Sequence, residues 1–238
     1  GVRAPEKSIP INNALMAYIP HFLALSASSP FWLGSDTGLA SARSKVFEGL
    51  PTAGLPYALS GWDAFEDYME TLISSRTIES IREVWWDIRP HPNFGTVELR
   101  ICDGIPTLGE IGVVAAFAQS LVETFDRTLD AGESLHEPKL WLVRENKWRA
   151  ARYGLDAEII VDDKGQQVRS LRDAVLELAS DLEPVARELG CADELGKVEE
   201  LLRVGASYQR QRAVAAAHDG DLRAVVDALI TEMDDGVL

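Results

Sequence analysis

The chain has 238 residues, with 23 lysines and arginines against 38 aspartates and glutamates, so its formal net charge at pH 7 is −15. Its apolar share of 46% and charged share of 26% are typical of a folded globular protein. The negative excess disfavours nucleic acid and anionic membrane surfaces as partners, because both are negatively charged themselves. No apolar stretch approaches the roughly 20 residues that span a bilayer, so we expect no membrane segment.

The cysteines and histidines exclude several kinds of site. Cys102 and Cys191 lie far apart, and neither is in a C-x-x-C motif. We therefore expect no disulfide framework, no thiolate metal site and a reducing, cytoplasmic location. The four histidines lack zinc-ligand spacing, and the chain has no P-loop or G-x-S-x-G motif.

The first third of the chain predicts two helices separated by a long loop. Apolar residues recur with helical spacing over residues 12–29. Within this range Pro20 predicts a kink or a restart, because proline lacks the amide donor. Residues 33–60 are rich in glycine and proline and predict a loop, and helical spacing returns over residues 61–75.

The clearest strand signal follows. Two runs, residues 84–90 and 95–103, flank a short loop at residues 91–94. In the second run apolar side chains at every other position alternate with polar ones. The pattern predicts an antiparallel strand pair.

Helices dominate the remainder. We expect them over residues 107–131, 134–152, 170–189, 192–204, 206–217 and 219–233. A small hairpin is predicted at residues 158–168. Ser170 with Asp173 resembles a capping box, and Gly190 marks the end of the helix that follows it. Two short strand pairs do not make a self-sufficient sheet, so we expect further strands from outside this chain.

The predicted strand pair carries charged residues two positions apart. Asp87 and Arg89 share one face of the first strand, and Glu98 and Arg100 share one face of the second. Carboxylates bind Mg²⁺ and guanidinium groups bind phosphate, so this face has the chemistry of a phosphoryl-transfer site. The alternative is a row of cross-strand ion pairs on a solvated face.

Two further segments concentrate cations. Residues 144–154 contain Arg144, Lys147, Arg149 and Arg152. They either bind an anion or complement the dipole of a helix C-terminus. The loop at residues 41–56 carries Arg43 and Lys45, which either close over an anionic substrate or belong to a surface connection.

Three motifs together make a specific resemblance. They are the runs RSKVFEGLPTAGLP (43–56), WWDIRPHPNFGTVELRICD (85–103) and ENKWRAARYGLDAEI (145–159), which follow one another in the same order as in one known family of enzymes. The chain resembles, over essentially all its residues, the carboxylate-amine ligase branch of the bacterial type-2 glutamate–cysteine ligases.

The resemblance implies an α+β, glutamine-synthetase-like fold: a curved antiparallel sheet, with ATP and Mg²⁺ on its concave face, packed against helices, and a helix-rich C-terminal half. It also implies an ATP-dependent ligase. The γ-carboxylate of glutamate is phosphorylated, and the amine of cysteine, or another amine, attacks the acyl phosphate.

Site residues are carried over by position in these motifs. Glu98 is expected to bind the metal, and Arg100 to lie near the transferring phosphate. Asp87 and Arg89 belong to the same catalytic signature. The resemblance places nucleotide or anion binding at Arg43, Lys147, Arg149 and Arg152.

The family's N-terminal metal motif is absent, so residues 1–238 are expected to form the C-terminal two thirds of a single, longer catalytic domain. The missing segment would complete the site. A homodimer is compatible with the resemblance, with apolar helices as its interface. The alternative function is a non-catalytic nucleotide-binding or scaffold protein that keeps the ligase fold, and a purely helical interaction domain would leave residues 87–103 unexplained.

Overall fold

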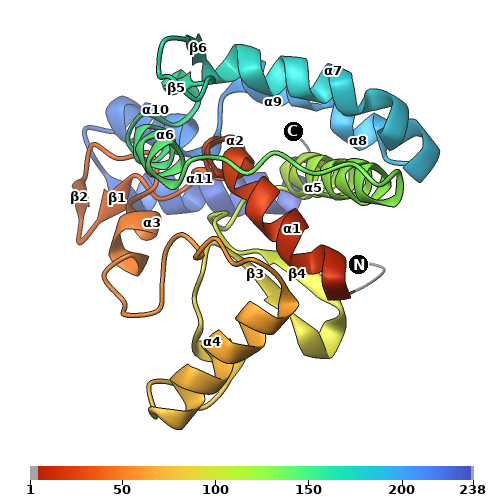
Figure 1. The fold of residues 1–238 in the computed structure, drawn as a ribbon. Helices are drawn as coiled ribbons and strands as arrows, with labels where there is room; N and C mark the ends of the chain where they lie inside the picture. Colours follow the sequence, from red (N-terminus) through yellow and green to blue (C-terminus); the bar gives the residue numbers. More distant parts are fainter. Residues whose placement is uncertain (1–4, 237–238) are drawn as a thin grey trace.

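The structure of the protein is a computed structural model, which describes residues 5–236. Helices make up most of it, and a strand pair lies below the main body of helices (Figure 1). The α-helices are α1 (Pro5–Leu15), α2 (Ile19–Ser26), α3 (Ala42–Phe47), α4 (Trp62–Ser74), α5 (Leu108–Asp130), α6 (Leu140–Tyr153), α7 (Leu171–Leu189), α8 (Ala192–Gly196), α9 (Val198–Val204), α10 (Ser207–Ala217) and α11 (Leu222–Asp235).

The described residues form three separate antiparallel strand pairs. They are β1 (Phe31–Trp32) with β2 (Ser35–Asp36), β3 (Ile88–His91) with β4 (Thr96–Leu99), and β5 (Glu158–Ile160) with β6 (Val168–Ser170). The described residues also contain short 3₁₀ helices: η1 (Met16–Tyr18), η2 (Ile81–Glu83), η3 (Pro92–Phe94) and η4 (Gly154–Asp156). The α+β class is confirmed, whereas residues 5–236 contain no larger curved sheet.

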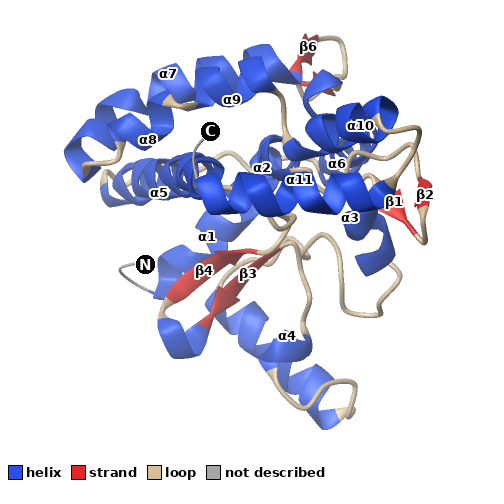
Figure 2. Cartoon of the chain, turned by 180° about the vertical axis from the view of Figure 1, so that it is seen from behind, coloured by secondary structure: helices blue, strands red, loops and turns tan. Residues whose placement is uncertain are grey.

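The β3–β4 pair has the predicted antiparallel form. Ile88 pairs with Leu99 and Arg89 with Glu98, so alternate residues of the two strands share a face. Ile88 and Leu99 join the main hydrophobic core, which also contains residues of α1. Seen from behind, the opposite face of the pair lies below α11 and no α-helix crosses it in this view (Figure 2), while η2 contacts Arg89 on this face.

The N-terminal helices differ in extent from the prediction but restart at the expected residue. The first begins at Pro5 rather than near residue 12, and η1 separates it from α2. Pro20 lies in the first turn of α2, where its missing N–H has no helical partner to lose. Residues 33–60 are not a loop throughout, because Ser41 accepts the Ser44 N–H and starts α3.

Three further boundaries depart from the predictions. Residues 134–139 precede α6 without being helical, and residues 192–204 form two short helices, α8 and α9. Ser170 makes no side-chain cap to α7, since it pairs with Glu158 as the last residue of β6. Gly190 does end α7, in the left-handed conformation that favours glycine.

Helix α5 is the one described helix that is long and apolar enough to cross a membrane by length and composition alone. This corrects the expectation that no apolar stretch reaches that length. In the fold, α5 packs against α1, α7 and α8, and its Val113, Phe117 and Leu121 belong to the main core. Such packing buries one side of the helix in the core, while Leu108 and Ile111 near its start remain exposed.

Candidate functional site

The predicted charged face centres on a buried ion pair between β3 and β4. Arg89 donates from Nε and Nη2 to Glu98 Oε2, at 3.0 and 2.5 Å. Its Nη1 donates to the carbonyls of Ile81 and Val84, at 2.6 and 2.9 Å. Arg89 is only 3% exposed, and these four hydrogen bonds hold the strand pair to η2 and to Val84.

Arg100 and Arg43 extend this pair into a cluster of three guanidinium groups. Arg100 Nη1 lies 3.8 Å from Glu98 Oε2, and the Arg100 side chain is 32% exposed. Burial lowers the pKa of Arg100, and the positive charges of Arg89 and Arg43 lower it further. Arg43 donates to the carbonyls of Arg100 and Ile101 and lies 3.6 Å from Asp103. Three cations therefore share two carboxylates, and the excess positive charge favours an anion.

Asp87 points to a second cluster instead of to the Arg89–Glu98 pair. Its Oδ2 accepts from Lys147 Nζ at 2.5 Å, and Glu48 Oε1 lies 2.6 Å from the same nitrogen. Lys147, on α6, is 2% exposed. Lys45 contacts the other oxygen of Glu48, at 2.9 Å.

The two carboxyl groups around Lys147 respond to it differently. Burial raises the pKa of Asp87, and the nearby negative charge of Glu48 adds to this, against the opposing effect of Lys147. Partial burial also acts to raise the pKa of Glu48, but its contacts with Lys147 and Lys45 outweigh burial and hold that pKa below its usual value. Asp87 is thus the carboxyl that burial disfavours in its charged form.

A cleft of about 440 Å³ opens beside this cluster. Cations and aromatic rings line it, among them Lys45, Arg144, Lys147, Tyr57, Tyr68, Trp86 and Trp148. Lys45 and Lys147 contact Glu48, whereas the structure gives no ion pair to Arg144 among residues 5–236. The cleft therefore presents one uncommitted guanidinium between aromatic walls.

Two of the predicted anion-binding residues lie outside both clusters. Arg149 donates to its neighbour Glu145 at 2.8 Å and to the Glu158 carbonyl at 3.2 Å. Arg152 lies over the ring of Tyr153, 5.6 Å from its centroid. Neither lines the 440 Å³ cleft. Anion binding by Arg149 and Arg152 stays a prediction.

Glu98 is the acidic residue of the open face that could meet a metal ion. Both of its cationic contacts use Oε2, and Oε1 has no hydrogen bond or ion pair within residues 5–236. Mg²⁺ is commonly held by one or two carboxylates together with substrate phosphates. Within residues 5–236 no group of three or more metal-ligating side chains occurs, so Glu98 fits as a single ligand and not as a complete site.

Sequence reasoning missed Glu48 and Arg144 as members of the clusters. Glu48 is part of the motif at residues 43–56, yet no local pattern links it to Lys147, 99 positions later in the chain. Arg144 is one of the four cations of residues 144–154, and no feature of the sequence distinguishes it from the other three.

Comparison with known proteins agrees with the motif resemblance. A model of glutamate-cysteine ligase family 2 matches residues 1–228. A protein of Frankia alni named "Putative glutamate--cysteine ligase 2-1" is 66% identical over 236 residues, which are 99% of this chain and 62% of that protein. A protein of Thermobifida fusca named "Putative glutamate--cysteine ligase 2" is 58% identical, over 99% of this chain and 59% of that protein. A protein of the same name from Mycobacterium tuberculosis is 52% identical, over 98% of this chain and 62% of that protein.

The chain spans about three fifths of the length of the curated relatives that it matches, between 59% and 62% for those three. The family match covers nearly all of its residues and includes both clusters described above. The chain therefore belongs to glutamate–cysteine ligase family 2.

Proposed function

We propose that this chain carries part of the active site of an ATP-dependent ligase that joins the γ-carboxylate of glutamate to the amine of cysteine or of a related compound. The observation that carries the proposal is the cluster of Arg43, Arg89 and Arg100 with Glu98 and Asp103, in which the side chains of Arg100 and Glu98 remain partly exposed. In a chain of net charge −15, this local excess of cations is an attractive place for a phosphate.

Each residue of the cluster has a distinct part in the proposal. Arg100 is partly exposed and has only one long contact, so its donors are available to the transferring phosphoryl group. Arg89 is committed to Glu98 and two carbonyls, which makes it the support that fixes the carboxylate. Glu98 Oε1 would supply one ligand to Mg²⁺, which neutralises phosphate charge when it is bound.

The aromatic cleft supplies the second element of the proposal. Arg144 could pair there with a substrate carboxylate, and Tyr57 and Trp148 would exclude water around it. Lys147 positions the neighbouring Asp87 and Glu48 without itself being free. We place the amino-acid substrates in this cleft.

The fold expected of the complete enzyme follows from the same strands. In the proposal, the β3–β4 pair is part of a larger curved antiparallel sheet, whose other strands come from the part of the relatives' length that this chain does not span. The charged face would then be concave and would hold the nucleotide.

The test is ADP release from Mg-ATP and glutamate, with and without cysteine, on this chain and on the chain extended to the length of its relatives. Arg100→Gln in the active form should lower kcat about a hundredfold or more, the effect typical of losing one donor to a transition-state anion. Glu98→Gln should weaken the dependence on Mg²⁺. Arg203→Gln and Glu199→Gln change the same charges on the helical surface and should leave the rate unchanged.

Full activity in Arg100→Gln and Glu98→Gln would contradict the assigned roles. Lack of turnover in both lengths of chain with every amine tried would favour the second candidate, a nucleotide-binding or scaffold protein with the same fold. The incomplete metal site within residues 5–236 is the observation behind this candidate. Calorimetry separates the two kinds of non-catalytic protein, because a scaffold gives no Mg²⁺-dependent heat with ATP.

A further inference from the structure

A second pocket, of about 320 Å³, lies between α2, α6, the β5–β6 hairpin and α7. Helix α6 separates it from the aromatic cleft: Leu142 and Asn146 line this pocket, whereas Arg144 and Lys147 line the other. The two sets lie on different sides of one helix. The pocket is therefore distinct from the proposed ligase site.

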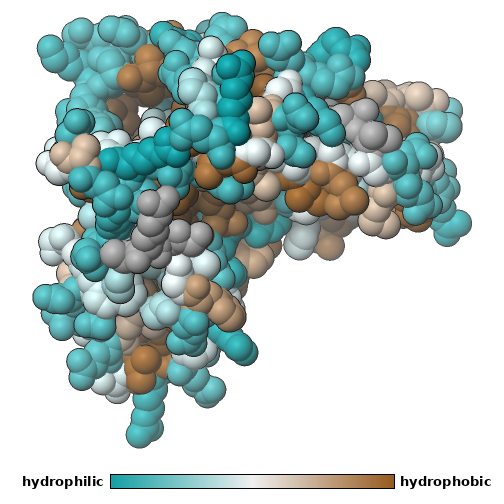
Figure 3. All heavy atoms as spheres, turned by 90° about the vertical axis from the view of Figure 1, so that its right-hand side faces the viewer, coloured by the Kyte–Doolittle hydropathy of each residue, from teal (hydrophilic) through white to brown (hydrophobic). Residues whose placement is uncertain are grey.

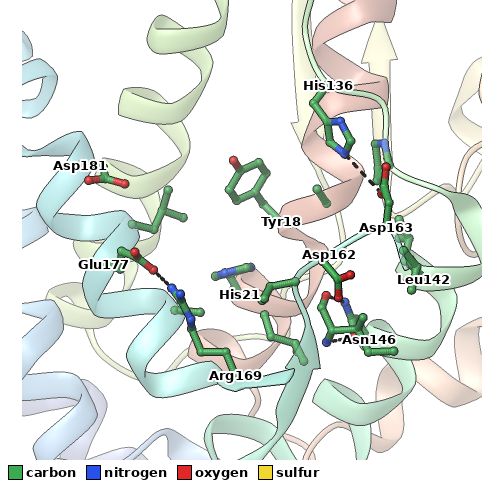
Figure 4. Close-up of a pocket in the computed structure, with 18 residues that line it drawn as sticks. Tyr18, His21, His136, Leu142, Asn146, Asp162, Asp163, Arg169, Glu177 and Asp181 are labelled. Carbon is green, nitrogen blue, oxygen red and sulfur yellow. Dashed lines mark hydrogen bonds and ion pairs between the residues drawn. The ribbon is translucent and has the colours of Figure 1, made fainter. Parts of the chain in front are cut away.

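The floor of the pocket contains a buried polar ring without a partner. His21 is only 9% exposed, and neither of its ring nitrogens has a hydrogen bond within residues 5–236; its Nδ1 is fully buried. Figure 4 shows His21 in the middle of the pocket, below Tyr18 and between the Arg169–Glu177 pair and Asp162. Burial lowers the pKa of His21 to about 4, so at neutral pH the ring is uncharged and one nitrogen is a hydrogen-bond acceptor.

The rim of the pocket is acidic. Its charged and titratable groups are Asp162, Asp163, Glu177, Asp181, Arg169 and His136. Glu177 pairs with Arg169, Asp163 lies 3.9 Å from His136, and Asp162 accepts two backbone N–H groups of its own turn. Asp181 is exposed and has no hydrogen bond or ion pair within residues 5–236, which leaves its carboxylate available.

Asp181 also acts on the neighbouring tyrosine. Burial raises the pKa of Tyr18, and the negative charge of Asp181 raises it further, so the two groups are close enough to interact. The rings of Tyr18 and His21 lie 5.5 Å apart. An aromatic ring, an unpaired carboxylate and an unpaired acceptor thus line one space. Aliphatic side chains also line it: Ala17, Leu142, Val143, Ile159, Ala174 and Leu178.

We propose that this pocket binds a small organic cation, an ammonium group on an apolar body, with the ammonium near Asp181 and Tyr18 and donating a hydrogen bond to His21. The aliphatic walls accommodate the body, and the tyrosine ring and the carboxylate attract the charge. The acidic rim disfavours an anion. A bare metal ion is disfavoured too, because no group of three ligating side chains occurs among residues 5–236.

The experiment titrates the full chain at neutral pH, without nucleotide or glutamate, with three ligands of one shape: benzylamine, benzyl alcohol and benzoate. Binding is followed by calorimetry and by the NMR signals of the His21 imidazole. Benzylamine should bind saturably and shift those signals, benzyl alcohol should bind more weakly, and benzoate should not bind. Absence of saturable binding by benzylamine, or equal binding by benzoate, would overturn the proposal.

Two variants and one control locate the site. Asp181→Asn should weaken benzylamine binding about two- to fivefold, the effect of one exposed ion pair. Asp227→Asn, on exposed α11, removes the same charge away from the pocket and should leave the affinity unchanged. His21→Phe should weaken binding about tenfold, as expected for a lost hydrogen bond to a charged donor. If Asp181→Asn and Asp227→Asn have equal effects, the attraction is only the net charge of the chain and the assignment fails, whether or not the ligase proposal holds.

Discussion

Lys147 illustrates how one residue joins distant parts of this chain. Its ammonium group lies between Asp87, which directly precedes β3, and Glu48, which follows α3, and it is almost completely buried. A buried cation with two carboxylates is stable only while its partners remain, since desolvation of an unpaired charge costs several kcal/mol. Lys147 therefore fixes the relative positions of the strand pair and the cleft.

The two carboxyl groups around Lys147 should give opposite pH dependences of stability. Because burial raises the pKa of Asp87 above its ordinary 3.8, its contribution is present below that value and is lost as the pH rises through the raised pKa. The pKa of Glu48 is lowered from 4.5, so its contribution is present above that value and is lost as the pH falls.

The measurement is urea unfolding of the natural chain, Asp87→Asn and Glu48→Gln from about pH 3 to about pH 7, where carboxyl groups titrate. With rising pH, the stability of the natural chain should fall relative to Asp87→Asn and rise relative to Glu48→Gln. If the stability differences from the two variants change in the same direction with pH, the opposite pKa shifts given to Asp87 and Glu48 are wrong.

Helix α6 ends just before Gly154, where the backbone lies very close to the side chain of Tyr208. Gly154 has φ +56°, and a Cβ placed on it would meet Tyr208 Cε1 at 2.4 Å. Tyr208, on α10, donates from its hydroxyl to the Tyr153 carbonyl at 3.0 Å. Glycine at this position therefore lets α10 dock directly on the end of α6.

Gly154→Ala should lower the free energy of unfolding by about 3 kcal/mol or more, from backbone strain together with a steric clash in a packed interface. Gly165→Ala is the matched control. Gly165 also has a positive φ, +71°, but no atom lies within 4 Å of the added Cβ, so only the strain of about 1 kcal/mol is expected. Equal losses in urea unfolding of the two variants would show that the contact with Tyr208 is unimportant.

At the scale of the whole molecule, the C-terminal helices are tied to the body by charge as well as by apolar contact. Arg210 on α10 contacts Glu110 on α5 at 2.9 Å and Glu232 on α11 at 3.0 Å. Glu110 has no exposed surface. The lower part of the molecule contains α4 and the β3–β4 pair (Figure 1). Figure 3 shows from the side that this part meets the helical body at an angle, and that hydrophobic side chains gather in this angle.

Arg210→Leu should destabilise the whole chain by about 3–5 kcal/mol, because it leaves the buried Glu110 carboxylate without its cation. Arg203→Leu is the control, since Arg203 contacts only the neighbouring Glu200 on the surface and such pairs contribute about 1 kcal/mol or less. Thermal and urea unfolding compare the two variants. A loss for Arg210→Leu no larger than that for Arg203→Leu would contradict the structural role of Arg210.

The local features of the fold were predictable from the sequence. Alternation over residues 95–103 predicts a strand with Glu98 and Arg100 on the face opposite the apolar residues. The structure forms β4 over Thr96–Leu99 and pairs Glu98 with Arg89, a register that alternation alone does not specify. Gly190 and the helical spacing of residues 61–75 likewise predict the elements found there. Such signals depend on neighbours along the chain, which is why they can be recognised without tertiary structure.

Contacts between distant residues were decided by the tertiary structure. The sequence determined the family, the strand pair and the charged face with Arg89 and Glu98. It did not indicate that Asp87 would turn to Lys147, or that Arg149 would contact the Glu158 carbonyl. It also predicted a Ser170 cap that the strand pairing of Ser170 excludes. The physical reason is the same in each case: a charged or polar side chain has several partners of similar energy, and the packing of remote elements selects among them.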